Sequence, residues 1–389
     1  MKRERERGFK LNIPILRIPY EEEDIRFIQD EIEKVLKSGF LTMASRVKAF
    51  EEQFASFCGV KYAIGTNTGT SSLEIILRAV DVEGKTVIMP SNTYMATPLA
   101  AIKAGGKVIF TECERENLQM DPDDLKDKIR EDTKVVVLVH IGGIISPRLN
   151  EIRKICGEHK VTLIEDAAHA HGATIDQHKA GNLGDAASFS FYPTKVLTTA
   201  EGGMLTTNDG EIYKKAIILR EHGKADNRFN IHTEIGDNWR FSELHAVLGL
   251  QQMKRVEWIL NERRRLASLY DEMLKDIQGI TLIKIPEEVN PAYYKYIVFL
   301  DKGLDRSVLK KNLKERYGVT LTGEVYSDPC HSQPVFEKYP DKIINKMDSF
   351  PNTDYVCKHH VCLPLYPGLK DEEVEYVVDS LKSVLRDVK

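Results

Sequence analysis

The sequence has no apolar run of the length that a membrane helix requires, so we expect no membrane span and no membrane partner. Its net charge is only -4 over 389 residues, and no basic stripe or DNA-binding helix pair is visible, so nucleic acid is not an expected partner. The first ten residues, MKRERERGFK, are basic, but no apolar run follows them, so we do not expect a signal peptide.

Cysteine is sparse, and no C-x-x-C pair occurs. This argues against a disulfide framework and a structural zinc site, and it favours a reducing compartment, so we expect a cytoplasmic protein. The six cysteines are Cys58, Cys113, Cys156, Cys330, Cys357 and Cys362. Two histidine pairs, at 169/171 and 359/360, lack the cysteine or carboxylate pattern of a metal site, so we expect no metal.

The length and the 42% hydrophobic content are sufficient for two domains with a large core. Residues 1–19 are charged and then extended, which predicts a flexible N-terminal arm. We predict a large domain over residues 20–260. We predict a smaller α+β domain over residues 261–389, where a long helical region that ends near Leu274 is followed by short strands and short helices. Tyr293–Leu300 is one of these expected strands.

Strand-like and helix-like segments alternate through the predicted large domain. This α/β alternation predicts a mostly parallel, seven-stranded sheet with helices on both faces, and ligands of such sheets bind at the carboxyl ends of the strands. The expected strands are Lys61–Ile64, Thr86–Met89, Lys107–Phe110, Val135–His140, Val161–Ile164, Ala186–Tyr192 and Gly203–Thr207.

Lys195 stands on a glycine- and threonine-rich loop between the last two of these strands. Burial at such a place lowers the pKa of a lysine, and a neutral amine can attack a carbonyl and form a Schiff base. The alternative is an ordinary surface lysine on a hairpin.

A second stretch, Gly65 to Ser72, follows a short strand and precedes helical spacing of apolar residues. Its five hydroxyl groups and two glycines at a helix start suit an anion, and phosphate is the usual ligand there. It is neither a Walker loop nor G-x-G-x-x-G. A plain capped helix is the alternative, although one serine or threonine would be enough for that.

Asp166 and Tyr94 each follow a predicted strand closely. Taken singly, Asp166 could cap a strand end and Tyr94 could pack in the core. Taken with the lysine and the phosphate turn, they match the needs of pyridoxal phosphate. A carboxylate keeps the ring nitrogen protonated, and an aromatic side chain stacks on the ring.

In this order, the motifs resemble those of the pyridoxal-phosphate sugar aminotransferases of the DegT/StrS type, with the aspartate-aminotransferase-like fold (type I). The resemblance extends from about Ile13 to Leu385. The matching motifs are Gly69-Thr70, Ser91 to Tyr94, Val139-His140, Glu165 to Gly172, Ser190 to Lys195, Glu201 to Gly203 and Gly236 to Arg240.

The resemblance implies a role for each matching residue. Lys195 would be the Schiff-base lysine and the proton shuttle, and Asp166 would pair with the ring nitrogen. His169 stands where the family often has glutamine, at a contact with the ring hydroxyl. The other implied cofactor contacts are Thr70, Ser71 and Ser190 to the phosphate, Tyr94 stacked on the ring, and Asn238 reaching the phosphate from a neighbouring subunit. The last contact implies a homodimer with shared active sites.

The implied reaction moves an amino group from L-glutamate or L-glutamine, through pyridoxamine phosphate, to a keto sugar, which we expect to be linked to a nucleotide, as in amino sugar biosynthesis. A cyclitol ketone acceptor, a non-catalytic pyridoxal-phosphate regulator, and a sugar dehydratase are alternatives. The dehydratase branch has histidine in place of the lysine, which is intact here.

Two segments depart from the family pattern, at His140 to Gly143, where an aromatic residue is missing, and at Val196 to Glu201. Both are expected near the sugar. The segments Gly323 to Tyr326 and Cys330-His331 are further candidates for the pocket lining.

Overall fold

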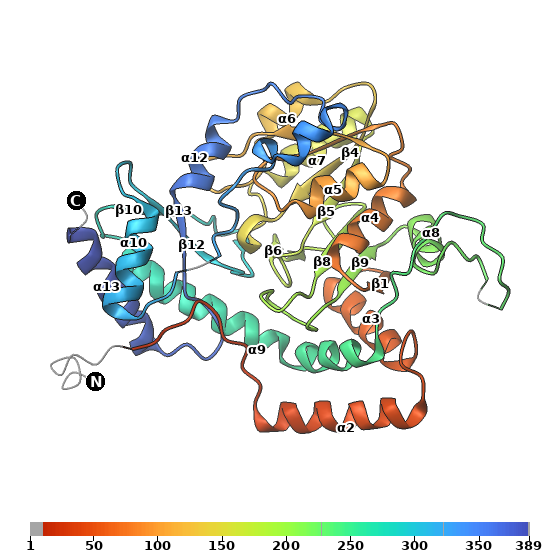
Figure 1. The fold of residues 1–389 in the computed structure, drawn as a ribbon, viewed down its shortest axis with the longest axis horizontal. Helices are drawn as coiled ribbons and strands as arrows, with labels where there is room; N and C mark the ends of the chain where they lie inside the picture. The colour runs from red at the N-terminus through yellow and green to blue at the C-terminus, as the bar shows by residue number, and fades with distance from the viewer. Residues whose placement is uncertain (1–10, 227, 322, 388–389) are drawn as a thin grey trace.

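The computed structural model describes residues 11–226, 228–321 and 323–387. Its centre is a seven-stranded sheet in the order β1-β9-β8-β5-β4-β2-β3 (Figure 1). The strands are β1 (Tyr62–Thr66), β2 (Thr86–Pro90), β3 (Lys107–Thr111), β4 (Thr133–Val139), β5 (Thr162–Asp166), β8 (Ala186–Ser190) and β9 (Gly203–Thr207). Strand β9 is antiparallel to both neighbours, and the other pairs are parallel. The predicted mostly parallel sheet is confirmed.

Both faces of this sheet are buried, and strand β4 shows how its sequence achieves this. Val135 and Val137 pack into one hydrophobic cluster, while Val136 and Leu138 pack into another on the opposite face. All four are fully buried. Successive side chains of a strand point to opposite faces, so an uninterrupted apolar run is what a sheet covered on both sides requires.

Two layers of helices cover the sheet. One layer consists of α3 (Ser45–Cys58), α6 (Pro122–Lys128), α7 (Leu149–His159) and the first part of α9 (Glu243–Leu274). The other consists of α4 (Gly69–Ala79), α5 (Ala96–Lys103) and α8 (Gly210–Arg220). Figure 1 shows α2 (Glu22–Ser38) lying apart from the sheet, along α9.

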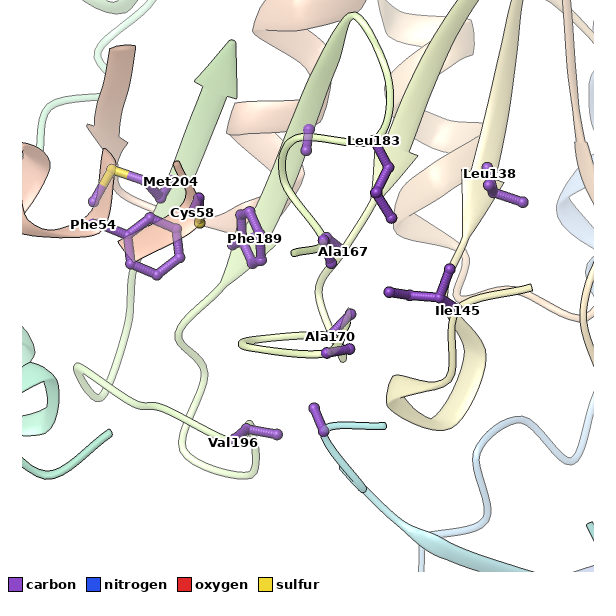
Figure 2. Packing of buried hydrophobic residues seen from close by; sticks show 14 of the residues in the cluster. Phe54, Cys58, Leu138, Ile145, Ala167, Ala170, Leu183, Phe189, Val196 and Met204 are labelled. Atoms are coloured by element: carbon purple, nitrogen blue, oxygen red, sulfur yellow. The ribbon is translucent and has the colours of Figure 1, made fainter. Parts of the chain in front are cut away.

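Aromatic rings pack the layer beneath β8 and β9. Figure 2 shows Phe54 and Phe189 close together beside Met204. The two phenyl rings meet edge to face with centroids 4.9 Å apart, and both are fully buried. Each buried phenylalanine contributes about 1.5–3 kcal/mol through the hydrophobic effect, so this contact fixes α3 firmly against the strands that flank Lys195.

The C-terminal part has its own sheet and core. Its elements are β10 (Ile280–Leu282), β12 (Tyr296–Leu300), β13 (His360–Leu363), α10 (Arg306–Asn312) with a π-helical turn (Leu313–Tyr317), α11 (Val335–Lys338), α12 (Pro351–His359) and α13 (Asp371–Asp387). A third, small sheet joins β11 (Val289–Asn290), β6 (Thr174–Ile175) and β7 (His178–Lys179).

Helix α9 crosses the predicted domain boundary at residue 260 without a break. Its residues up to Leu260 pack into the core of the large sheet, and from Leu266 onward they pack into the C-terminal core. The boundary stays a prediction, and the change of core along α9 is the feature that supports it. Within the described residues, no helix has the length and apolarity needed to cross a membrane.

The flexible N-terminal arm stays a prediction, and residues 1–10 lie outside the described residues, but the described part of the arm is anchored at one point. Ile13 is fully buried in the C-terminal core. Its N–H donates to the Gly318 carbonyl at 3.0 Å, and its carbonyl accepts from the N–H of Thr320 at 3.0 Å. Buried apolar area and these two bonds fix the chain at Ile13.

Candidate active site

A cavity of about 650 Å³ opens at the carboxyl ends of β5 and β8. Six of the eight predicted site residues line it: Thr70, Tyr94, Asp166, His169, Ser190 and Lys195. Ser71 and Asn238 are not among the described residues that line this cavity. The volume falls within the range of small-molecule sites, and the location agrees with the rule for open α/β sheets.

Lys195 is held by a turn, since its N–H donates to the Tyr192 carbonyl at 2.9 Å. Its Nζ lies 4.9 Å from the ring centroid of Tyr294. Burial lowers the pKa of Lys195 to about 8; Asp166 opposes this shift, and Lys295 adds to it. The side chain therefore lies in the cavity wall, with a pKa that leaves much of the amine neutral near pH 8, and it is not a surface lysine.

The hydroxyl groups in the turn before α4 serve both of the purposes considered above: some cap the helix, and others face the cavity where a phosphate could bind. Thr68 caps the helix, because its Oγ1 accepts from the Ser71 N–H at 3.0 Å and contacts the Ser71 Oγ at 2.9 Å. Ser71 is thus used within the cap and is buried. The start of the helix and Thr70 face the cavity beside Ser190. The positive end of the helix dipole therefore faces this part of the cavity.

The close approach between this turn and β8 depends on Gly69. A Cβ at Gly69 would lie 2.9 Å from the Ser190 Cβ and 3.0 Å from the Phe189 carbonyl oxygen. Any side chain at this position would push the helix start away from the strand end. Glycine here therefore keeps the hydroxyl groups of Thr70 and Ser190 on one side of the same cavity.

Asp166 ends β5, and both of its carboxylate oxygens are oriented. Oδ2 accepts from the Thr97 hydroxyl at 2.8 Å, and Oδ1 accepts from the Ala168 N–H at 3.2 Å. Thr97 is in turn 2.9 Å from the Thr93 hydroxyl. The strand-end cap considered for Asp166 is real, yet the carboxylate also faces the cavity. Thr97 was not among the predicted site residues, although its place near the start of a helix that follows a strand end was an available signal.

The neighbouring carboxylate, Glu165, anchors this strand end from inside the core. It is fully buried and accepts bonds from the N–H groups of Gly181, Leu183 and Gly184 at 2.7–2.9 Å. The Nε2–H of His140 donates to it at 2.9 Å. A buried carboxylate with four donors is well satisfied, and it fixes the backbone that presents Asp166.

Aromatic side chains line the cavity opposite the phosphate turn. Tyr94 is 64% exposed, so the alternative that it packs in the core is wrong. Its ring lies near that of Tyr326, with centroids 6.1 Å apart. His169 is buried and stacks on Tyr294, with centroids 4.1 Å apart and an interplanar angle of 18°. Tyr294 was not among the predicted site residues, because it falls within the expected strand Tyr293–Leu300.

Of the four segments that were expected to line the sugar side of the cavity, two contribute residues to its described lining and two do not. Glu324 to Tyr326 line the cavity, and so does Glu201. The described lining residues do not include Cys330 or His331. Cys330 is buried, with its Sγ near the Thr93 carbonyl, and His331 bonds through Nδ1 to the Ser91 hydroxyl at 2.7 Å.

Gly142 and Gly143 are not among the described residues that line the cavity, and Gly143 packs against the backbone of His169. A Cβ at Gly143 would be 2.7 Å from the His169 carbonyl oxygen and 3.0 Å from the Tyr294 nitrogen. Gly143 also has a positive φ of 85°, which favours glycine. Glycine at position 143 therefore allows the backbone of Tyr294 to approach that of His169, whereas Gly142, which stands where the family has an aromatic residue, lies against Ile297.

Asn238 lies on the surface, outside the cavity of its own chain. Its backbone carbonyl accepts from the Asn67 side chain at 3.4 Å, so it stands near the start of the phosphate turn. Its predicted role in a neighbouring subunit stays a prediction. Among the described residues, no group of three or more histidine, cysteine or acidic side chains could hold a metal.

These residues fit pyridoxal phosphate in three respects. A helix start with Thr70 and Ser190 would hold the phosphate, and the oriented carboxylate of Asp166 would hold the protonated ring nitrogen. Lys195 offers an amine that burial keeps partly neutral. The buried Nδ1 of His169 has no partner among the described residues, so this imidazole has unused hydrogen-bonding capacity at the site.

Comparison with known proteins agrees with this site. The model of the DegT/DnrJ/EryC1/StrS aminotransferase family matches residues 22–382. The chain belongs to this family. It is 32% identical over 371 residues to the spore coat polysaccharide biosynthesis protein SpsC of Bacillus subtilis, covering 92% of this chain and 94% of SpsC.

A second member of the family, the dTDP-3-amino-3,6-dideoxy-alpha-D-galactopyranose transaminase of Aneurinibacillus thermoaerophilus, is 32% identical over 356 residues, covering 91% of this chain and 94% of that enzyme. The solved structure of DesV from S. venezuelae in complex with a ketimine intermediate superimposes with a TM-score of 0.88 at 27% identity, covering 96% of this chain and 98% of DesV. The fold is that of these type I enzymes.

Membership in this family makes the protein a pyridoxal-phosphate-dependent transaminase of the sugar aminotransferase type. One structural neighbour has been solved in both its pyridoxal-phosphate and its pyridoxamine-phosphate forms. The predicted cofactor and enzyme class are confirmed. The sugar and the amino donor are not determined by family membership, because members share their fold while differing in substrate.

Proposed function

We propose that the protein transfers an amino group from L-glutamate or L-glutamine to a nucleotide-linked keto sugar. The observation that carries this proposal is that Lys195 and Asp166 face one cavity from adjacent strand ends, with the helix start of α4 beside them. The name of the 32% identical transaminase, which refers to a dTDP-linked amino sugar, supports a nucleotide-linked acceptor.

The chemistry that the bound cofactor supplies is electron withdrawal from the carbon that carries the amino group. The protein side chains supply the rest. Asp166, oriented by Thr97, stabilises positive charge on the ring nitrogen. Lys195, with a pKa of about 8, can hold or release a proton near neutral pH, as a general acid–base group must. Tyr94 offers an exposed ring face for stacking.

The donor half of the proposal is tested by incubating the purified holoenzyme with single amino acids and following the visible absorbance of the cofactor. L-glutamate or L-glutamine should discharge the band, while D-glutamate serves as the control. Persistence of the band with every donor would overturn the proposal and would favour a non-catalytic regulator.

The acceptor half is tested with enzyme that has been loaded with amino groups and freed of the donor. Nucleotide-linked keto sugars should restore the visible band, and the same sugars without nucleotide should restore it far more slowly. Recovery with a cyclitol ketone alone would replace the proposed acceptor by the cyclitol alternative.

We further propose that the enzyme is a homodimer in which Asn238 completes the site of the partner. In support, Asn238 is exposed and lies outside the cavity of its own chain. Mixed and refolded Lys195→Ala and Asn238→Ala subunits should regain about a quarter of the wild-type activity, because half of the dimers then contain one intact site. No recovery would show that Asn238 acts within its own subunit, and wild-type activity of the Asn238→Ala protein alone would show that it has no role.

A further inference from the structure

Four nearly parallel rings follow one another along the aromatic wall of the cavity. Tyr94 and Tyr326 have centroids 6.1 Å apart with a 27° angle, and Tyr326 and His169 are 5.7 Å apart with a 21° angle. His169 and Tyr294 complete the series at 4.1 Å. His169 is thus in ring contact with two tyrosines that come from distant parts of the chain.

One hydrogen bond within this series involves the imidazole. The Tyr326 hydroxyl lies 3.2 Å from Nε2 of His169. The other ring nitrogen, Nδ1, is buried and has no hydrogen-bond partner among the described residues. Stacking on Tyr294 fixes the plane of the imidazole but does not distinguish the two orientations that a 180° flip about the Cβ–Cγ bond exchanges. The Tyr326 hydroxyl is therefore the polar contact that orients the ring.

Both partners of this bond are neutral near pH 7. Burial lowers the pKa of His169 well below 6.5, with Lys195 and Lys295 adding to the effect. Burial also raises the pKa of Tyr326 well above 10, and the charge of Asp166 acts in the same direction. A neutral phenol and a neutral imidazole form a single, directional bond, and that bond favours one tautomer.

We propose that Tyr326 is a positioning residue that holds the imidazole of His169 in the orientation with which it meets an oxygen of the cofactor ring. This inference depends on the proposed contact between His169 and the ring hydroxyl. The glutamine often present in the family has a flexible side chain that can adjust by itself, whereas an imidazole needs neighbours to fix its plane and its orientation about the Cβ–Cγ bond. Tyr294 fixes the plane by stacking, and Tyr326 fixes the orientation through its hydroxyl group.

The segment that carries Tyr326 is itself held firmly. The N–H of Val325 donates to Nε2 of His360 at 3.0 Å, and Lys310 pairs with Glu324 at 2.6 Å. Both partners belong to the C-terminal part, at β13 and α10. The contact between Tyr326 and His169 therefore ties the C-terminal part to the cofactor side of the cavity.

The test is a double-mutant cycle on Tyr326→Phe and His169→Gln, read as the equilibrium affinity of the apoenzyme for pyridoxal phosphate. Loss of one neutral hydrogen bond should weaken binding about three- to tenfold for Tyr326→Phe in the wild-type background. In the His169→Gln background, the same change should have less than a twofold effect, because the imidazole that it orients is gone. Equal weakening in both backgrounds, or none in either, would overturn the inference.

Tyr355→Phe is the matched control. Tyr355 also stacks on a histidine, His359, with centroids 4.3 Å apart, but it is not among the described residues that line the cavity. It should leave the cofactor affinity unchanged.

A second measurement does not depend on the cofactor. Imidazole ¹⁵N shifts of His169 in the apoenzyme should report one neutral tautomer in the wild type and a mixture in Tyr326→Phe. Identical shifts in the two proteins would overturn the inference. A wild-type protein that showed the single tautomer but bound no pyridoxal phosphate would instead contradict the proposed function.

Discussion

The sheet side of the cavity and the side formed by Tyr294, residues 324–328 and Gln333 differ in how their groups are fixed. On the sheet side, Asp166 and Ser190 end buried strands, and Gly69 brings a helix start against them. On the other side, Tyr326 lies in a segment without regular secondary structure. Its position depends on side-chain contacts such as those of His360 and Lys310.

This difference separates two tasks. A packed sheet holds the side chains at its strand ends in fixed positions, which suits the residues that contact the reacting atoms. Groups on an irregular segment can change without disturbing the core, and they suit the adjustment of affinity and of substrate choice. Substitutions on the sheet side should therefore abolish the chemistry, whereas those on the other side should alter binding and stability more moderately.

The largest effect is expected for Lys195→Ala. The variant loses both the amine that holds the cofactor and the group that moves protons, so turnover should fall by at least about 10⁴-fold. Stability should hardly change, because the side chain lies in the cavity wall. Borohydride treatment followed by mass spectrometry should place the cofactor on residue 195 of the wild type. Wild-type turnover in the variant, or trapping at another lysine, would contradict this assignment.

Asp166→Asn should have the next largest effect, because it keeps the shape but removes the charge, and its single oxygen can accept from Thr97 or from Ala168 but not from both. Loss of one preorganised electrostatic contact costs about 10²–10³-fold in turnover. The visible band should still form, since Lys195 is intact. Thr97→Val, which removes the hydroxyl that orients Asp166, should show a smaller loss of the same kind. If Asn at 166 left turnover unchanged, the ring-nitrogen role would be wrong.

The two sides of the cavity also differ in how well their residues could be predicted from the sequence. The strands of the sheet were recognisable because their apolar runs are short and local, and strand β9 matches its predicted range of Gly203–Thr207. The motif residues at strand ends follow directly from those strands. Even so, Ser71 was expected at the phosphate, whereas its hydroxyl bonds to the capping residue Thr68, a local competition that residue type alone does not resolve.

The other side of the cavity was mostly not predictable, since it is assembled from segments far apart in the chain. Residues 293–300 were expected as one strand, but β12 begins only at Tyr296. Tyr293 has a positive φ of 48°, and this backbone turn directs the chain past His169 before the strand starts. Tyr294 therefore lines the cavity and is not part of the C-terminal sheet. The spacing of apolar residues in the sequence does not predict such a turn.

A moderate effect is expected when the support of the irregular segment is removed. His360 donates from Nδ1 to the Val356 carbonyl at 2.6 Å and accepts from the Val325 N–H at 3.0 Å. His360→Ala leaves that N–H without its partner and should cost about 1–3 kcal/mol of unfolding free energy. Turnover should fall about tenfold through the displacement of Tyr326. Calorimetry and steady-state kinetics measure the two effects.

His360→Gln is the matched control, because it can restore an acceptor for Val325 and should recover part of both losses. The pH dependence separates it further. Burial lowers the pKa of His360 to about 4, so between pH 6.5 and 4 the unfolded chain binds a proton that the folded chain does not. As the pH is lowered from 6.5 to 4, the unfolding free energy of the wild type should therefore decrease, and that of His360→Gln should decrease less. Parallel pH profiles would contradict the assigned role.

The smallest effect is expected at Lys295, whose Nζ lies 5.1 Å from the same Tyr294 ring centroid that Lys195 approaches at 4.9 Å. Its positive charge disfavours the ammonium form of Lys195. Lys295→Met should raise the pKa of Lys195 above about 8, toward 10.5, and leave less neutral amine at pH 7. Attachment of pyridoxal phosphate to the apoenzyme should slow about three- to tenfold at that pH and recover at higher pH. Lys295→Arg, which keeps the charge, and Lys346→Met, which removes an exposed charge elsewhere, should behave like the wild type. Equal slowing in Lys295→Met and Lys295→Arg, with Lys346→Met unaffected, would show that Lys295 acts through packing and not through its charge.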